Sequence, residues 1–301
     1  MKLVIRADDV GYTNVCNIGT FETIESGVST SADIMLDTPG TVDALERLRA
    51  YPWISLGWHT HFWGSPVLGD DKVPTMFDAS RNGFRKDLQT AADVSFEEAL
   101  AECRAEIELC VKILGRAPDV GAYPDFDSPF ARAIKLVHEE YSIVANYMNI
   151  DFPVAFYKAD DKWAEREIYM RGLWTSVKAL KAEPVNSIGW TDSIAALEKY
   201  DPIKFYTEDE SKLLEVKDDS ITVHAWHPGY VDYYVYRLGD YTPPSKCFIQ
   251  IRTVDAHALC SQEVKDWIRI NKVELINFRD ALYGTREYQN HLRAIGSDLA
   301  V

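Results

Sequence analysis

Two adjacent carboxylates close the first apolar run of the chain. Lys2–Tyr12 reads KLVIRADDVGY, so an alternating run leads directly into Asp8 and Asp9 and is ended by Gly11. The run is typical of a buried strand, on which alternate side chains share a face: Leu3, Ile5, Ala7 and Asp9 on one, Val4, Arg6 and Asp8 on the other. Neighbouring acids repel each other and are tolerated mainly where a metal or a cationic group compensates. A simple turn is the alternative interpretation, because Asp and Gly form turns readily.

Two histidines end a later strand-like run, Ile54–His59, in the sequence His59-Thr60-His61. This spacing places both imidazoles on one face of an extended chain. Histidine and carboxylate are typical ligands of divalent metals, and an open coordination position would hold water. We expect His59 to be a ligand and His61 to be a packed or surface imidazole.

Another histidine, His227, ends the strand-like run Ser220–His227. It shares a face with the apolar residues of that run and would therefore point inward, whereas His224 would not. Imidazole titrates near neutral pH, so His227 could donate a proton to a leaving group. We expect His224 to have only a structural role.

The composition excludes several classes of protein. The 301 residues are 47% apolar, which is enough for a large core, and the net charge of -15 argues against nucleic acid or an anionic membrane as a partner. No run approaches the roughly 20 apolar residues of a membrane span, and the first is too short for a signal peptide, so we expect a cytoplasmic protein. The five cysteines are scattered without a CxxC pair and are expected to be reduced and structural.

Strand-like and helical patterns alternate along the chain. Beyond the opening strand, strands are expected at 32–36, 54–59, 120–123, 143–146, 220–227 and 273–278, with a weaker one near 184–188. Helices are expected at 43–49, 96–114, 162–180 and 193–200, and behind the capping residues Thr13, Ser128 and Ser261; Ser95 and Glu98 form a capping box before 96–114. The loop 62–92 lacks periodicity and is expected to cover a site.

This alternation favours one α/β domain over residues 1–301. No Gly/Ser-rich or Pro-rich linker divides the chain, and no GxGxxG follows the first strand, so a dinucleotide fold has little support. The length fits a single-domain, distorted (β/α) TIM-like barrel. The site of such a barrel lies at the carboxyl ends of its strands, where Asp8, Asp9, His59 and His227 fall.

Aromatic residues crowd the same loops. Their flat faces suit the apolar sides of sugar rings, and phenol and indole donors suit hydroxyl groups. Core packing explains some of them equally well, so none is assigned to a ligand: Trp58, Phe62, Trp63, Trp226, Tyr230, Tyr233, Tyr234 and Tyr236.

Several segments together resemble the YdjC/ChbG family of carbohydrate deacetylases. They are Ala7-Asp-Asp-Val-Gly11, Asn17-Ile-Gly19, Gly27-Val-Ser-Thr-Ser31, Leu56-Gly-Trp-His59, His227-Pro-Gly229 and the ending from Arg252 through Asp255 to Phe278. The resemblance covers nearly the whole chain. It implies a distorted barrel, a divalent metal (magnesium or zinc) and removal of acetyl groups from amino sugars such as chitin-derived oligosaccharides. By position it also implies Asp9 and His59 as metal ligands, Asp8 as general base and His227 as general acid.

The sequence departs from the family at the third metal ligand. The family has a histidine-rich segment after the fourth strand, but residues 121–129 here read GAYPDFDSP, with Pro124 at the ligand position. We therefore name Asp125 as a candidate third ligand, with His61 or water as the alternatives. Asp125 and Asp127 could also be solvated loop acids beside a helix start.

These residues predict a hydrolase that removes acetyl groups from N-acetylated sugars. In this hypothesis the metal polarises the acetamide carbonyl, Asp8 takes a proton from the attacking water, and His227 protonates the departing amine. One alternative is a glycosidase with two carboxylates, for which Asp8 and Asp9 are too close to flank a sugar bond and a distant acid such as Asp125 would be needed. The other is a metal-free sugar-binding protein without catalysis. The expected partner is a small carbohydrate substrate, and a homodimer is one option for the assembly.

Overall fold

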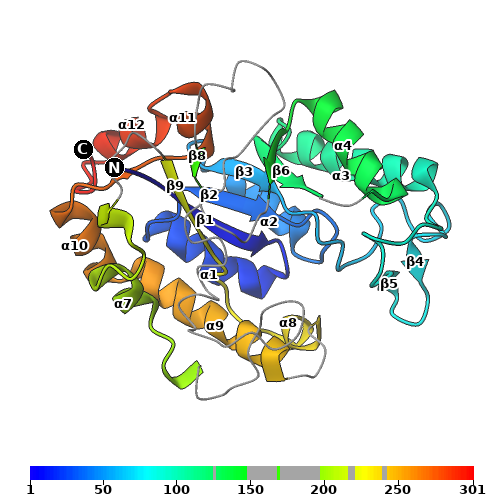
Figure 1. Ribbon diagram of the computed structural model, residues 1–301, viewed down its shortest axis with the longest axis horizontal. Coiled ribbons are helices and arrows are strands. Elements are labelled where there is room, and N and C mark those ends of the chain that lie inside the picture. The colour runs from blue at the N-terminus through cyan, green and yellow to red at the C-terminus, as the bar shows by residue number, and fades with distance from the viewer. Residues whose placement is uncertain (125–126, 148–167, 170–196, 216–220, 239–242) are drawn as a thin grey trace.

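A parallel β-sheet with helices packed around it forms the centre of the protein (Figure 1). The computed structural model describes residues 1–124, 127–147, 168–169, 197–215, 221–238 and 243–301. Within these ranges the elements are, in order, β1 (Lys2–Val10), α1 (Asn14–Glu25), β2 (Ser31–Ile34), α2 (Thr41–Leu48), β3 (Ser55–Trp58), β4 (Phe77–Asp78), β5 (Gly83–Phe84), α3 (Phe96–Leu114), β6 (Val120–Tyr123), α4 (Pro129–Tyr141), β7 (Val144–Tyr147), β8 (Ile168–Tyr169), α7 (Pro202–Thr207), η2 (Leu213–Glu215), β9 (Ile221–Trp226), α8 (Tyr233–Leu238), α9 (Pro243–Cys260), α10 (Gln262–Ile270), β10 (Glu274–Leu275), α11 (Phe278–Tyr283) and α12 (Glu287–Ala294).

The strands of the large sheet follow the order β7-β6-β3-β2-β1-β9-β8, and β10 pairs with the start of β1. All of these neighbours are parallel, and Ala7 of β1 lies opposite Ala32 of β2 and Trp226 of β9. The carboxyl ends of parallel strands meet at one edge, so the last residues of β1 and the residues that follow β3 and β9 come together there. The predicted parallel α/β fold is therefore confirmed. The described strands form an open sheet, with no pairing between β7 and β8, so the predicted TIM-like closure is not part of the described structure.

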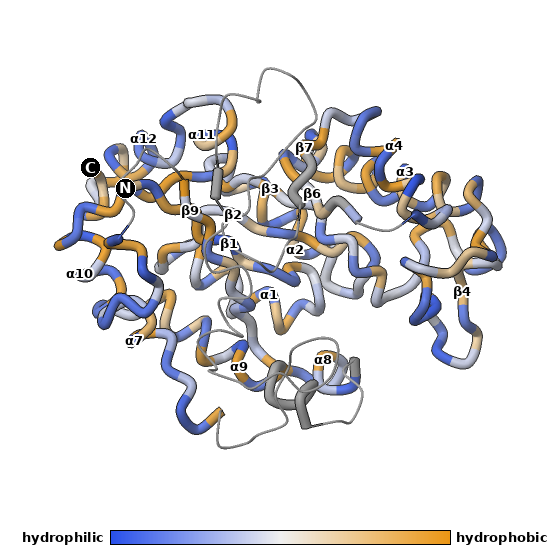
Figure 2. Tube along the Cα trace, in the orientation of Figure 1, coloured by the Kyte–Doolittle hydropathy of each residue, from blue (hydrophilic) through white to orange (hydrophobic). Residues whose placement is uncertain are grey.

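The two faces of β1 pack into different apolar clusters. Leu3 and Ile5 belong to the large cluster that α1, α2, α3 and α10 cover, whereas Val4 packs on the opposite face with residues of β6, β7, β9 and α11. In Figure 2 the colour along these central strands changes between orange, for apolar residues, and white or blue, for more polar ones. Each fully buried aliphatic side chain contributes roughly 1.5–3 kcal/mol relative to an exposed one, so β1 is a firmly held base for a site.

The helices begin at the capping residues that the sequence predicted. In α1, α3, α4 and α10, a side-chain oxygen accepts a hydrogen bond from a backbone N–H of the first turn; the caps are Thr13, Ser95, Ser128 and Ser261. Gly115 ends α3 in a left-handed conformation, which glycine adopts without steric cost. The predicted capping box is only half formed, because the Glu98 carboxylate accepts hydrogen bonds from Thr75 instead.

The prediction was wrong for the segments on either side of α10. Helix α9 lies between the strand predicted at 220–227 and the helix predicted behind Ser261, where no helix was predicted. Its buried Arg252 and Asp255 interrupt the apolar pattern by which the helix could have been recognised. The strand predicted at 273–278 is only the two-residue β10. Asn277 then caps α11 and forms a complete capping box there.

Two further differences concern the long connections. The loop 62–92 contains the short antiparallel hairpin of β4 and β5. Residues 168–169 form the strand β8 inside the helix predicted at 162–180. The rest of that helix, the strand near 184–188 and most of the helix at 193–200 lie outside the described residues.

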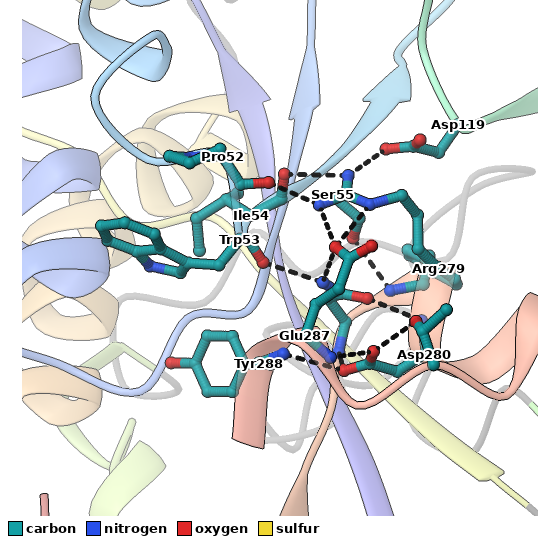
Figure 3. A network of polar contacts seen from close by, with 12 residues as sticks. Pro52, Trp53, Ile54, Ser55, Asp119, Arg279, Asp280, Glu287 and Tyr288 are labelled. Carbon is teal, nitrogen blue, oxygen red and sulfur yellow. Dashed lines mark hydrogen bonds and ion pairs between the residues drawn. The ribbon is translucent and has the colours of Figure 1, made fainter. Parts of the chain in front are cut away.

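A network of polar contacts ties α11 to the start of β3 (Figure 3). The Arg279 guanidinium donates to the carbonyl oxygen of Pro52 at 2.6 Å and to Oδ2 of Asp119 at 2.9 Å. The backbone N–H of Phe278 donates to the Ser55 hydroxyl at 2.9 Å. These contacts fix the amino end of β3, and the histidines His59 and His61 follow its carboxyl end.

Two expectations from the composition, on the cysteines and on membrane spans, can be compared with the described residues. The cysteines Cys16, Cys103, Cys110 and Cys260 are free thiols, and the first three are buried. Among the helices that the structure describes, none combines the length and the apolar character needed to cross a bilayer.

Candidate active site

Strand β1 delivers Asp8 and Asp9 to the carboxyl edge of the sheet through a break in its regular backbone. Asp9 has a φ of 58°, in the left-handed region, and the pairing with β2 shifts register between Ala7 and Val10. Aspartate enters this region more readily than most residues because its short polar side chain can bond locally. Regular alternation would have sent Asp9 toward the helix-facing cluster. The irregularity instead brings both carboxylates to one site.

The two carboxylate oxygens of Asp9 have different neighbours. Oδ2 accepts a short hydrogen bond from Nη2 of Arg252 on α9, at 2.5 Å. Oδ1 faces the Nε2 atoms of His59 and His61, at 2.9 and 3.7 Å. Burial raises the pKa of Asp9, but Arg252 and the nearby histidines outweigh it and hold that pKa well below its usual range. Asp9 is thus an ionised carboxylate, oriented through one oxygen and directed at the imidazoles with the other.

A tight turn brings the two imidazoles together. Strand β3 ends at Trp58, and the backbone N–H of His61 donates to the carbonyl oxygen of His59 at 2.9 Å across Thr60. The two rings then meet edge to face, with centroids 4.1 Å apart. The structure therefore places both histidines beside Asp9, by a turn rather than by the continued strand that the sequence suggested.

The residues present fit a divalent metal. Oδ1 of Asp9 and Nε2 of His59 are buried and lie 2.9 Å apart, and neither atom has a partner that satisfies the criteria for a hydrogen bond. Together with His61, their ligand atoms lie within 4.8 Å of one another. Burial and the neighbouring His59 lower the pKa of His61 to about 3, so its imidazole is neutral, the form that binds a metal. One carboxylate and two imidazoles are a typical donor set for zinc-like ions.

Asp8 is bound on both of its oxygens by Arg6. Nε of Arg6 donates to Oδ1 at 2.5 Å and Nη2 donates to Oδ2 at 2.8 Å, with both side chains buried. Burial raises the pKa of Asp8, but Arg6, His59 and His227 together bring it below its usual value. Nη1 of Arg6 lies 3.4 Å from a second buried carboxylate, Asp33 of β2. Arg6 therefore keeps Asp8 ionised and in one orientation.

His227 faces Asp8 from the end of β9. Its Nε2 lies 3.9 Å from Oδ2 of Asp8, and its backbone N–H donates to Oδ2 of Asp255 on α9 at 3.0 Å. Asp255 also accepts a hydrogen bond from the Tyr200 hydroxyl. Burial lowers the pKa of His227 to about 4, although Asp9 and Asp8 act to raise it. This pKa is lower than the value near neutrality that was assumed from the sequence. The imidazole is therefore neutral in this structure and placed to exchange a proton with Asp8.

Sequence reasoning did not assign roles to four polar residues that shape the site: Arg6, Asp33, Arg252 and Asp255. Arg6 had a detectable signal, because a cation two residues before Asp8 must share its strand face. Arg252 and Asp255 are spaced so that they share one face of a helix. This spacing would have indicated a common role if α9 had been predicted. Asp33 sits on β2 opposite Gly57, where a Cβ atom would lie 2.0 Å from Oδ1 of Asp33, so the glycine makes room for the carboxylate.

Other predicted residues lie at the edge of the site or away from it. Asp125 is outside the described residues, whereas Asp127 is a surface acid paired with Arg132 at 3.2 Å. His224 lies on the other face of β9, where Nδ1 is 3.1 Å from the hydroxyl of Tyr206. Among the aromatic residues, Trp63 stacks on His61 with centroids 4.1 Å apart.

The fold and the site define an α/β protein with carboxylates and histidines gathered at the carboxyl edge of a parallel sheet. The chain belongs to the YdjC-like protein family, whose model matches residues 2–269. The resemblance noted in the sequence is thereby confirmed.

Relatives of this family cover nearly the whole chain. The carbohydrate deacetylase of Brevibacillus brevis is 26% identical over 287 residues, which are 93% of this chain and 99% of that protein. The carbohydrate deacetylase of Listeria monocytogenes serotype 4a is 24% identical over 292 residues, 93% of this chain and all of that protein (100%). A solved structure from Enterococcus faecalis, described as a candidate cellobiose-phosphate cleavage protein, superimposes with a TM-score of 0.60 at 20% identity and covers 93% of this chain and 98% of that chain. This likeness shows that the fold is shared.

Proposed function

We propose that the protein is a metal-dependent carbohydrate deacetylase that hydrolyses the acetamide group of N-acetylated sugars, such as chitin-derived oligosaccharides. The observation that carries the proposal is the convergence of two pairs at one edge of the sheet. Asp9 and His59 present unpartnered ligand atoms to each other. Asp8 and His227 lie beside them with 3.9 Å between Oδ2 and Nε2. The deacetylase names of the relatives support the same activity.

Asp9 and His59 would hold the divalent metal. When bound, the ion supplies Lewis-acid polarisation of the acetamide carbonyl and a lower pKa for water. Arg252 fixes Oδ2 of Asp9, so that Oδ1 is the oxygen offered to the ion. Imidazole donors favour zinc, or a zinc-like ion, over magnesium, which prefers an all-oxygen shell.

Asp8 is the proton acceptor for the attacking water. Arg6 holds the Asp8 carboxylate ionised and oriented, which leaves its remaining lone pairs to accept the proton as water adds to the carbonyl carbon. The C–N bond then breaks, and the amine nitrogen needs a proton. His227 is placed to carry that proton from Oδ2 of Asp8 to the amine through Nε2, with its backbone held by Asp255. The products are acetate and the free amino sugar.

Charge and surface chemistry support a neutral or amino sugar as the substrate. With a net charge of -15, the protein accommodates a neutral or amino sugar more easily than a strongly anionic ligand. Exposed aromatic side chains, including Trp63 and Tyr234, offer flat surfaces on which sugar rings stack.

Acetate release by the metal-loaded protein tests the proposal. We expect acetate from N-acetylated chitooligosaccharides, and a loss of about 10²–10⁴-fold in rate for Asp8→Asn, because the amide cannot take up the proton. The matched control is Asp127→Asn, a surface acid, which should retain the full rate. No acetate from any N-acetylated sugar, or an unchanged rate in Asp8→Asn, would overturn the proposal. Release of shorter sugars without acetate would favour a glycosidase, and retained sugar binding without bound metal would favour a binding protein.

A further inference from the structure

We propose that His61, backed by the indole of Trp63, is the third protein ligand of the divalent metal. The inference rests on the proposed function, because it concerns the same metal. It assigns the missing ligand to the turn after β3 rather than to Asp125 or to water. Three protein ligands with one open position are typical of catalytic zinc sites.

The ligand atoms of His61 already point to the same place as those of Asp9 and His59. Nε2 of His61 lies 3.7 Å from Oδ1 of Asp9, the oxygen that Arg252 does not bind. In the part of the chain that the structure describes, these three residues form the one group of this kind whose ligand atoms all lie within 4.8 Å of one another. A small movement of the side chains is enough to surround an ion with them.

Trp63 holds the His61 imidazole in this orientation. The two rings are stacked with centroids 4.1 Å apart and an interplanar angle of 2°. The His59 ring also contacts the imidazole, in a T-shaped arrangement with centroids 4.1 Å apart, and the Tyr12 ring contacts the indole with centroids 5.6 Å apart. The His61 side chain is only 22% exposed. An imidazole clamped in this way is oriented for binding before the metal arrives, which lowers the entropic cost of coordination.

The backbone on either side of Trp63 is also fixed. Phe62 adopts a left-handed conformation with a φ of 55° and is buried against the rings of Phe84 and Phe130. The backbone N–H of Gly64 donates to Oδ2 of Asp37 at 2.6 Å. A Cβ atom at Gly64 would lie 1.9 Å from the carbonyl oxygen of Asp37, so only glycine allows this close approach. A strained residue held by core packing next to a ligand is typical of a functional constraint.

Metal affinity and a cobalt spectrum test the assignment without an activity measurement. Purified full-length protein is stripped of metal, then titrated with Zn²⁺ by competition with a chelator and with Co²⁺ by visible absorption. We expect one equivalent of metal in the wild type. In His61→Gln we expect affinity to fall by more than about 100-fold, with a changed cobalt spectrum, because loss of a ligand should exceed the roughly 10–100-fold effect of removing an outer-shell partner. Trp63→Leu keeps all three donors, and its metal affinity should fall by about 10–100-fold. This variant gives an independent result if His61→Gln does not fold.

His291→Gln is a matched control. His291 also stacks on a tryptophan, Trp53, with centroids 3.6 Å apart, but it lies in α12 and takes no part in the site. This variant and Asp125→Asn should bind metal as the wild type does. Unchanged affinity and spectrum in His61→Gln, or a loss in Asp125→Asn instead, would overturn the assignment while leaving the deacetylase proposal intact. A wild-type protein that binds no metal would overturn both.

Discussion

The Arg6 guanidinium and the Asp8 carboxylate form a double hydrogen bond beneath the site, with Nε donating to Oδ1 at 2.5 Å and Nη2 to Oδ2 at 2.8 Å. Their two-residue spacing on β1 places both on one strand face. The proposed base, Asp8, is therefore oriented by a residue of the same strand. Arg6 also lies 3.4 Å from Asp33, so one buried cation faces two buried carboxylates.

Removal of the Arg6 charge should destabilise the fold. We expect Arg6→Gln to lower the free energy of unfolding by about 3–5 kcal/mol, because it leaves buried carboxylates without a cation. Urea denaturation at pH 7 measures the effect. Arg81→Gln, which removes an exposed arginine, is the control and should change stability by no more than about 0.5 kcal/mol. An Arg6→Gln midpoint equal to that of the wild type would contradict this role.

Gly57 and Asp33 should be energetically coupled. Gly57→Ala would place a Cβ atom 2.0 Å from Oδ1 of Asp33 and should cost about 1–3 kcal/mol of stability through overpacking. Removing the carboxyl group in Asp33→Ala makes room for that methyl group, because Cγ of Asp33 would also lie only 2.3 Å from it. The double variant should therefore be more stable than the sum of the single effects predicts, with a coupling of about 1 kcal/mol or more. Additive effects in urea denaturation would show that the two side chains do not compete for space.

Most strands of the central sheet could be predicted, because apolar periodicity is a local signal; these are β1, β2, β3, β6, β7 and β9. Asp8 and His227 lie on the strand faces that alternation assigned to them, and the capping serines mark helix starts correctly. Each of these features depends on a few consecutive residues. A single sequence is informative about features of this short range along the chain.

The remaining parts of the site depend on contacts between distant segments. Asp9 reaches the site through a left-handed residue, and His61 through a turn, neither of which alternation can reveal. Helix α9 was missed because Arg252 and Asp255 are buried polar residues that face the site and break the apolar pattern. Local rules fail most often where function requires an exception.

His138 should make stability depend on pH. Burial lowers the pKa of His138 to about 4, below the ordinary value near 6.5 that it regains on unfolding. Between these values the unfolded chain binds a proton that the folded protein does not, so stability falls as the pH drops from about 6.5 to 4. His138→Gln should reduce this decline by up to about 3 kcal/mol. His257→Gln, at an exposed position, should leave the decline unchanged; identical pH profiles for wild type and His138→Gln would refute the prediction.

Glu106 should make the protein less stable as the pH rises above the ordinary pKa of a glutamate, 4.5. Burial, with Asp37 and Glu102 nearby, raises the pKa of Glu106 well above its ordinary value, so the folded state resists an ionisation that the unfolded state undergoes. Glu106→Gln cannot ionise and can still accept the hydrogen bond from Nε1 of Trp58, now 2.8 Å long. We expect a gain of about 1–3 kcal/mol at pH 8 by urea denaturation. A less stable Glu106→Gln would contradict this, and the exposed Glu108→Gln should be neutral.

Acetate release measured on one preparation before and after metal removal tests the central claim most directly. Protein stripped with a chelator should release no acetate from an N-acetylated chitooligosaccharide, and one equivalent of Zn²⁺ should restore release in the wild type but not in Asp9→Asn, which lacks the charged ligand oxygen. Equal acetate release by the metal-free and metal-loaded protein would contradict the claim that Asp9 and His59 form a catalytic metal site.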